Sequence, residues 1–61
     1  MSTRRAVALL KRNGWVILRT RGSHTVWKSR RGALFTLPDG HREISPGVVR
    51  NLMKIVEESD G

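Results

Sequence analysis

The chain has 61 residues and no cysteine, and this combination limits it to one small domain whose stability comes from packing alone. A domain of this size buries only about 60% of the surface that its unfolded chain exposes. Its net stability is therefore about 3–5 kcal/mol. Without cysteine there is neither a disulfide nor a Cys/His metal site to add to that margin. We expect residues 1–61 to form a single domain built from a few helices and strands.

Two segments have the apolar spacing of helices, and they lie towards the two ends of the chain. In the first, apolar residues three and four apart follow Ser2-Thr3, either of which can cap a helix, and Gly14 is a suitable left-handed stop. In the second, Ser45-Pro46 pairs a capping serine with proline at the first helical position. The apolar stripe that follows, from Val48 to Val56, is wide enough to cover a sheet.

Between these helices the apolar residues alternate with period two, which is typical of strands. We expect strands over residues 15–21, 24–29 and 33–37, joined by a tight II′ turn at Gly22-Ser23 and a second turn at residues 30–32. Alternation puts Trp15, Ile17, Arg19 and Arg21 on one face of the first strand. Because apolar residues occur on both faces of that strand, alternation alone leaves open which face is buried.

The expected order of helix, three strands and helix is an α+β fold of the form α-β-β-β-α. Strands joined by consecutive hairpins form an antiparallel sheet, and two helices pack most economically on one of its faces. We therefore expect a three-stranded antiparallel sheet with two helices on one face and the other face free. No segment has the character of a signal peptide or a membrane span, so a cytoplasmic protein without membrane contact is expected.

The charge of the chain is strongly positive. Lys and Arg number 12 against 5 Asp and Glu, and Glu57, Glu58 and Asp60 all lie at the C-terminal end. Up to residue 56 the only acids are Asp39 and Glu43. A small body this cationic concentrates polyanions, most often nucleic acid. The simpler alternative is a basic surface that only keeps the protein soluble.

Few residues could carry out chemistry. The sequence offers no cysteine nucleophile, no paired carboxylates at a useful spacing, no glycine-rich phosphate loop and no metal-ligand motif. We therefore expect neither a metal nor a small-molecule cofactor. Two histidines remain, His24 and His41. Cleavage of RNA needs little more, because its 2′-hydroxyl is a built-in nucleophile and a neutral imidazole can accept the hydroxyl proton near neutral pH.

His24 is the stronger of these two candidates. It follows Gly22-Ser23 at the mouth of a hairpin, where a side chain projects from a rigid strand and a bare glycine lets a phosphate approach. On these residues alone, an ordinary surface histidine after a turn is the simpler interpretation of His24. His41 lies in a polar loop, where no functional role is the simpler interpretation and backbone positioning or phosphate contact is the alternative. We expect five cations to cluster beside His24 and contact phosphates: Arg19, Arg21, Lys28, Arg30 and Arg31.

Three aromatic residues complete the inventory. Trp27 and Phe35 could stack on bases if they lie on the free face of the sheet. In a chain this small, aromatic side chains are more often part of the core, and the same interpretation applies to Trp15 directly after the helix stop. The sequence leaves both possibilities open for the two strand residues.

Four segments, taken in order and at their spacing, resemble the HicA toxin family over nearly the whole chain. Residues 8–15 are similar to its opening, a leucine-bearing helix that ends in glycine followed by an aromatic residue. Residues 19–24 resemble its Gly-Ser-His turn with a basic lead-in. Pro38 with His41 is similar to its Pro-x-x-His loop, and residues 46–54 resemble its closing helix.

The resemblance implies a double-stranded-RNA-binding-domain-like fold and the toxin of a HicA/HicB-type toxin–antitoxin system. It implies ribosome-independent cleavage of mRNA by an endoribonuclease, with His24 as the catalytic residue, and a HicB-type antitoxin partner. From the residues themselves we expect this cleavage to need no metal and to use His24 as general acid or base. The charge suggests that this partner covers His24 with an acidic surface and uses an apolar anchor such as Trp27. The residues expected to bind RNA are Arg19, Arg21, Gly22, Ser23, Lys28 and Arg30.

A non-catalytic, small basic RNA-binding module is the main alternative. Ordinary double-stranded-RNA-binding domains carry a lysine cluster at the start of the second helix, whereas this chain has the uncharged residues 45–49 there. A DNA-binding regulator fits less well, because the pattern offers no pair of helices joined by a short turn that could enter a major groove.

Overall fold

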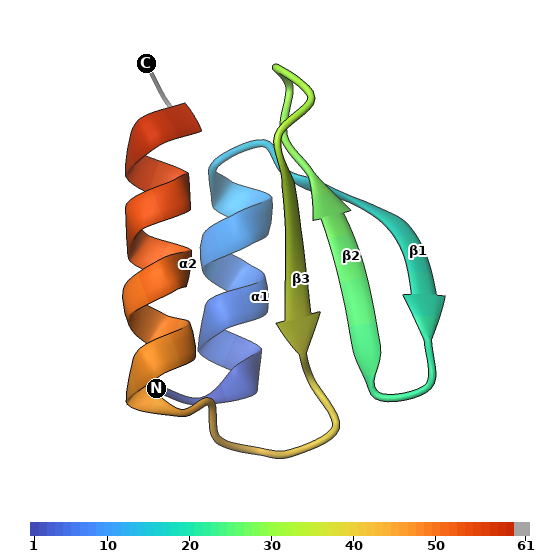
Figure 1. Cartoon of the computed structure of the whole chain (residues 1–61), viewed down its shortest axis with the longest axis vertical. Coiled ribbons are helices and arrows are strands. Elements are labelled where there is room, and N and C mark those ends of the chain that lie inside the picture. The colour runs from blue at the N-terminus through green and yellow to red at the C-terminus, as the bar shows by residue number, and fades with distance from the viewer. Residues whose placement is uncertain (60–61) are drawn as a thin grey trace.

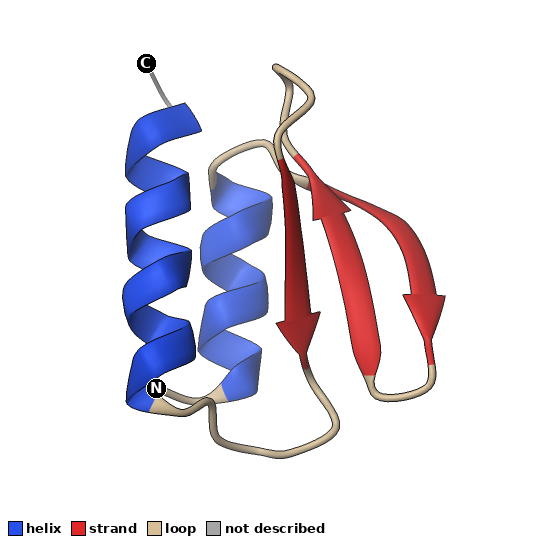
Figure 2. Cartoon of the chain, viewed as in Figure 1, coloured by secondary structure: helices blue, strands red, loops and turns tan. Residues whose placement is uncertain are grey.

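The structure is a computed structural model of the chain and describes residues 1–59. Helix α1 (Thr3–Arg12) is followed by strands β1 (Val16–Arg21), β2 (His24–Lys28) and β3 (Leu34–Pro38), and helix α2 (Pro46–Ser59) closes the chain. The order confirms the predicted α-β-β-β-α fold (Figures 1 and 2). Within the described residues, neither helix is both long enough and apolar enough to cross a membrane.

The ends of α1 follow the predicted signals. Ser2 is the N-cap, and its side-chain oxygen accepts a hydrogen bond from the backbone N–H of Arg5 at 3.1 Å. Asn13 caps the C-terminus, and Gly14 follows with a φ of 84°, the left-handed conformation that a glycine adopts without strain. In α2, Pro46 is the first helical residue and the N–H of Val49 reaches the carbonyl of Ser45 at 3.0 Å.

The three strands form one antiparallel sheet in the order β1-β2-β3. The pairing of β1 with β2 shifts between Ile17 and Arg19, so that Ile17 lies opposite Trp27 while Arg19 lies opposite Val26. Residues directly opposite each other share a face of the sheet, so this bulge puts Ile17 and Arg19 on different faces. The prediction that they share one face is therefore wrong, because simple alternation assumes an unbroken ladder.

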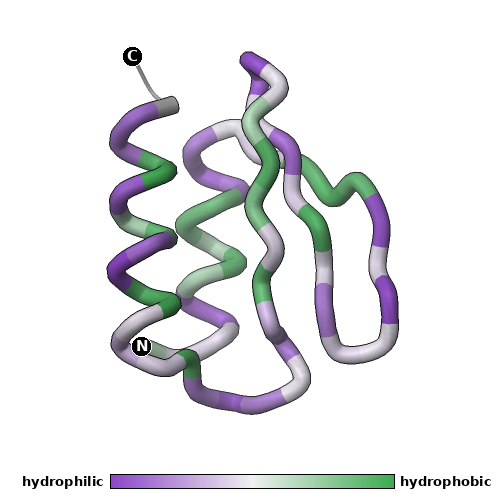
Figure 3. Tube along the Cα trace, viewed as in Figure 1, coloured by the Kyte–Doolittle hydropathy of each residue, from purple (hydrophilic) through white to green (hydrophobic). Residues whose placement is uncertain are grey.

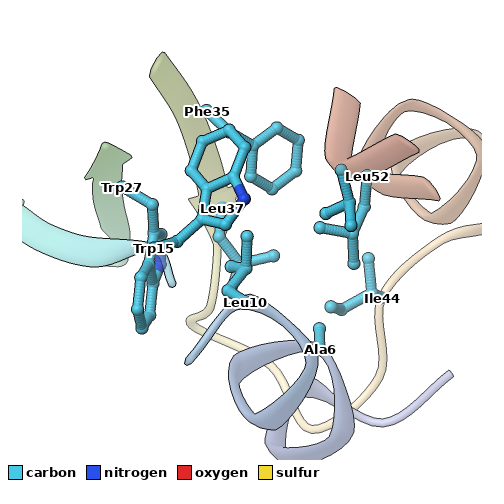
Figure 4. Packing of buried hydrophobic residues seen from close by; sticks show 9 residues of the cluster. Ala6, Leu10, Trp15, Trp27, Phe35, Leu37, Ile44 and Leu52 are labelled. Carbon is cyan, nitrogen blue, oxygen red and sulfur yellow. The ribbon is translucent and has the colours of Figure 1, made fainter. Parts of the chain in front are cut away.

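The buried residues show which face of the sheet the helices cover. In β2 and β3 burial alternates, and Thr25, Trp27, Phe35 and Leu37 point to the same side. They meet Ala6 and Leu10 of α1, Leu52 and Val56 of α2, and also Trp15 and Ile44, in one core (Figure 4). Both helices therefore lie on one face of the sheet, and the opposite face is open.

The two strand aromatics belong to the core. Trp27 is 1% exposed and Phe35 is 9% exposed, on the helix-facing side of the sheet. Neither ring is available to stack on a base, so the interpretation of both as core residues is confirmed. Trp27 cannot anchor a partner either, and that expectation is wrong. Trp15 is also buried, as predicted for a packing residue.

Strand β1 differs from the other two because it is exposed along its whole length. It lies at the edge of the sheet farthest from the helices (Figure 1). Figure 3 shows it as an apolar stretch followed by a hydrophilic stretch towards the turn into β2. The apolar stretch is Val16, Ile17 and Leu18, and the hydrophilic one ends at Arg21.

Candidate functional site

His24 lies on the open face of the sheet, at the first position of β2. It pairs with Arg21 of β1 on one side and with Pro38 of β3 on the other. Its side chain is exposed, and so is that of Arg21. Because residues directly opposite each other share a face, the imidazole and the guanidinium of this pair project from the same side of the sheet.

The same face carries two more of the predicted cations. Arg19 pairs with Val26, and Lys28 lies between Val16 of β1 and Leu34 of β3. Lys28 is four residues from His24, which is about 13 Å along a strand. The register thus brings Arg19, Arg21 and His24 together near one end of the open face, with Lys28 at the other end of the same strand.

The turn before His24 is a two-residue hairpin. Gly22 has a φ of 56° and Ser23 does not have a positive φ, which fits the predicted II′ turn and excludes I′. A side chain added at Gly22 would meet no atom within 4 Å. Nothing in the described chain therefore covers the backbone next to His24 at this residue.

The loop after β3 contacts this turn. The N–H of Asp39 donates to the carbonyl of Ser23 at 2.9 Å, and the hydroxyl of Thr25 donates to a carboxylate oxygen of Asp39 at 2.6 Å. Gly40 packs so closely that a Cβ built on it would lie 2.4 Å from the Cβ of Ser23. The loop after β3 therefore holds both residues that flank His24 in the sequence.

Asp39 and Gly40 were not among the predicted site residues. The only sequence signal for them is the turn-forming run Pro38-Asp39-Gly40, which indicates a turn but not what it packs against. Thr25 is 4% exposed and faces the core side, so its hydroxyl serves the loop rather than the open face. Contact between residues so far apart in the chain becomes visible only in the folded structure.

Arg30 does not lie beside His24. The two hairpin turns are at opposite ends of the sheet (Figure 1), because one precedes β2 and the other follows it. Arg30 folds towards the end of α1, where a Cβ added to Gly14 would lie 2.6 Å from its Nε. The prediction that the cations of both turns cluster beside His24 is therefore wrong for Arg30 and Arg31, and Lys28 lies about 13 Å from His24 along β2.

His41 lies in the loop that supports the His24 turn but lines a separate hollow. The other residues of this hollow are Ser2, Thr3, Arg4 and Arg42. Backbone hydrogen bonds join the loop to the start of α1, among them Thr3 N–H to the Arg42 carbonyl at 2.8 Å. The two histidines are thus neighbours through one loop without sharing a site.

The open face around His24 combines a proton-accepting ring with positive charge. Neither acidic residue of the segment 1–56 faces it, since Asp39 is bonded to Thr25 and Glu43 lies 3.5 Å from the N-terminal amino group. Such a surface attracts phosphates, and the imidazole can exchange a proton with a group that they bring. Among the described residues, no three His, Asp or Glu side chains gather as metal ligands would.

The comparison with protein families gives one match. The family model described as the HicA toxin of bacterial toxin-antitoxin systems matches residues 3–57. No curated protein and no solved structure matches the chain. The matched range includes every strand, the whole of α1 and all but the end of α2.

Proposed function

The chain belongs to the HicA toxin family of bacterial toxin–antitoxin systems, and from this premise we propose that it is an endoribonuclease that cleaves mRNA without a metal ion. The observation that carries the proposal is the position of His24, exposed on the open face of the sheet and paired across the hairpin with Arg21. An exposed imidazole with a guanidinium on the same face of the sheet suits RNA, whose 2′-hydroxyl supplies the nucleophile.

The proposed reaction needs one proton acceptor and one donor. His24 takes the proton of the 2′-hydroxyl while the 2′-oxygen bonds to the neighbouring phosphorus. The bond between phosphorus and the 5′-oxygen breaks, and this oxygen takes up a proton from the imidazolium or from water. The products are a 2′,3′-cyclic phosphate and a free 5′-hydroxyl, so no water molecule is required as the nucleophile of the cleavage step.

The cations and the turn have distinct tasks in this proposal. Arg21 donates hydrogen bonds to the non-bridging oxygens where negative charge develops. Gly22 and Ser23 let the RNA backbone approach, because no side chain stands over the glycine. Arg19 and Lys28 contact phosphates further along the open face. Arg30 points to another part of the molecule and is left out of the contact set.

A protein antitoxin is the expected partner of a chain from this family. We assign it the HicB type, with an acidic surface that covers His24 and pairs with Arg19, Arg21 and Lys28. The apolar anchor is not Trp27, which is buried. Val16 and Leu34 take that place, because they are 60% and 54% exposed on either side of Lys28 on the same face.

The experiment that tests the function follows from its chemistry. Purified protein is incubated in excess EDTA with a mixed-sequence RNA and, as the matched control, with the same sequence made as DNA. We expect fragments from RNA alone, with a cyclic or 3′-phosphate on one fragment and a 5′-hydroxyl on the other. A 5′-phosphate would indicate an activated water instead, and binding without fragments would indicate a non-catalytic RNA-binding module.

A further inference from the structure

The first turn of α1 carries charges of the unfavourable sign. Arg4 and Arg5 both lie there, and the turn contains no acidic residue. Positive side chains at a helix N-terminus oppose the helix dipole, which destabilises the helix by a few tenths of a kcal/mol each. A favourable contact with an anion would offset this cost, and for Arg4 the structure shows where such a contact could be made.

Arg4 shares one hollow with a second arginine and a histidine. His41 and Arg42 line it from the loop after β3, together with the hydroxyl residues Ser2 and Thr3. The side chains of Arg4, His41 and Arg42 are all exposed. Two segments far apart in the sequence therefore bring like charges together at one surface depression.

The backbone fixes the two segments relative to each other. Thr3 donates through its N–H to the carbonyl of Arg42 at 2.8 Å and through its hydroxyl to the carbonyl of His41. The N–H of Ile44 donates to the carbonyl of Met1 at 2.9 Å, and the backbones of Ser2 and Glu43 pair as an isolated antiparallel β-bridge. None of these contacts uses the side chains of Arg4, His41 or Arg42, so these three side chains are left for a ligand.

Counter-charges are missing from the hollow. Within residues 1–59 neither Arg4 nor Arg42 forms an ion pair, and the neighbouring acid, Glu43, lies against the amino group of Met1 at 3.5 Å. Among the leading amides of α1, the N–H groups of Thr3 and Arg5 already have acceptors. An anion in the hollow would thus be held by guanidinium and imidazole groups, which suit the oxygens of a phosphate.

The same loop connects the hollow to the His24 turn. Gly40 packs against Ser23, directly before His24, and the next two residues are His41 and Arg42 of the hollow. We propose that the hollow is a second phosphate-binding site for the same RNA strand, which passes from His24 across Gly40 to Arg4 and Arg42. This inference rests on the proposed function, because it names RNA as the ligand.

The test measures binding without cleavage. The probe is a fluorescent RNA octamer with 2′-O-methyl riboses, which lacks the nucleophile, and its affinity is measured by anisotropy over a range of salt concentrations. The variant combines Arg4→Gln with Arg42→Gln. The matched control combines Arg50→Gln with Lys54→Gln, which removes two exposed cations from α2 and changes the net charge equally. None of the four side chains is buried, so both variants should fold.

We expect the hollow variant to bind the octamer about tenfold more weakly than the wild type, the effect of one lost charge-assisted contact. The slope of log affinity against log salt should fall by about 0.7, which corresponds to one phosphate of a single strand. The control should keep the wild-type slope. Equal losses in the two variants would overturn the proposal, because they would reflect net charge alone.

Amide chemical shifts of the wild-type protein give a second measurement that needs no variant. Adding the octamer should move the resonances of Thr3, Arg4, His41 and Arg42 as well as those around His24. Changes confined to the His24 turn would contradict the second phosphate site without contradicting the proposed nuclease function. Changes at the hollow in a protein that leaves unmodified RNA intact would support the hollow and overturn the cleavage mechanism.

Discussion

The two hairpin turns of the sheet look alike in the sequence and differ in the structure. Each has a glycine with positive φ, Gly22 at 56° and Gly32 at 91°, and each is flanked by arginine. The second turn is closed by its own residues, with Ser29 and Ala33 bonded to each other through N–H, carbonyl and hydroxyl groups. The first is supported by a distant loop, through Asp39 and Gly40.

This difference shows what makes one turn a candidate site. The first turn leads into a histidine on the open face, and the loop after β3 holds both neighbours of that histidine, through the Ser23 carbonyl and the Thr25 hydroxyl. A catalytic group must be held in position to be effective, and for His24 the loop after β3 provides that support. The other turn instead places Arg30 against the end of α1.

The largest effect should come from the histidine itself. His24→Ala should reduce cleavage by at least about 10²-fold, as expected for loss of a general acid or base. The fold and the affinity for RNA should change little, because the side chain is exposed. Cleavage of a defined RNA, together with anisotropy and circular dichroism, measures all three.

The matched control for that variant is His41→Ala, in the loop behind the turn. It should reduce cleavage less, since the structure places His41 in the neighbouring hollow. Equal rates for wild type and His24→Ala would end the proposed mechanism. A larger loss for His41→Ala than for His24→Ala would mean that the two histidines have been assigned the wrong way round.

A smaller effect should separate the two turns in binding the antitoxin. Arg19→Glu combined with Arg21→Glu should slow association at low salt by about 10- to 100-fold, because opposite charges steer encounter. Arg30→Glu combined with Arg31→Glu has the same charge change at the far turn and should slow it much less. Stopped-flow or surface binding with the purified partner gives the rates.

If the Arg30 and Arg31 double variant associated more slowly than the Arg19 and Arg21 double variant, the partner would bind at the other end of the sheet. A structure of the complex with His24 open to solvent and the partner on the helices alone would exclude inhibition by covering the site. An indirect mechanism would then have to replace it.

The smallest effect tests the support behind the first turn. In Gly40→Ala the new Cβ would lie 2.4 Å from the Cβ of Ser23, so the turn or the loop must shift. We expect kcat/KM for RNA cleavage to fall about tenfold, since small displacements of a catalytic group are costly, and stability to fall by about 1–3 kcal/mol. Activity assays and thermal unfolding measure these two quantities.

Gly47→Ala is the control, because a Cβ there meets no atom within 4 Å and alanine favours the helix by about 0.5–1 kcal/mol. Its cleavage rate should equal that of the wild type. Adding Ser23→Gly to Gly40→Ala removes the clashing atom and should restore activity to the level of Ser23→Gly alone. Full activity in Gly40→Ala would show that the contact does not position His24.

Much of the fold was predictable because its signals are local. Ser2 and Gly14 mark the ends of α1, Pro46 marks the start of α2, and Gly22-Ser23 predicts the II′ turn that the structure contains. Caps and turns depend on the backbone conformations that single residues favour, and these preferences follow directly from residue type. The bulge between Ile17 and Arg19 was not predictable, since it depends on the partner strand.

Of the candidate site, the sequence by itself determined the side-chain chemistry: a histidine after a glycine turn, a large excess of positive charge and no cysteine. Only the tertiary structure decided the neighbours. In the structure Arg21 pairs with His24, whereas Arg30 lies at the far end of the sheet. Trp27 is buried, and Asp39 and Gly40 contact the residues on either side of His24. The reason is physical, because side-chain chemistry belongs to each residue, whereas neighbourhood depends on strand register and on which face the helices cover.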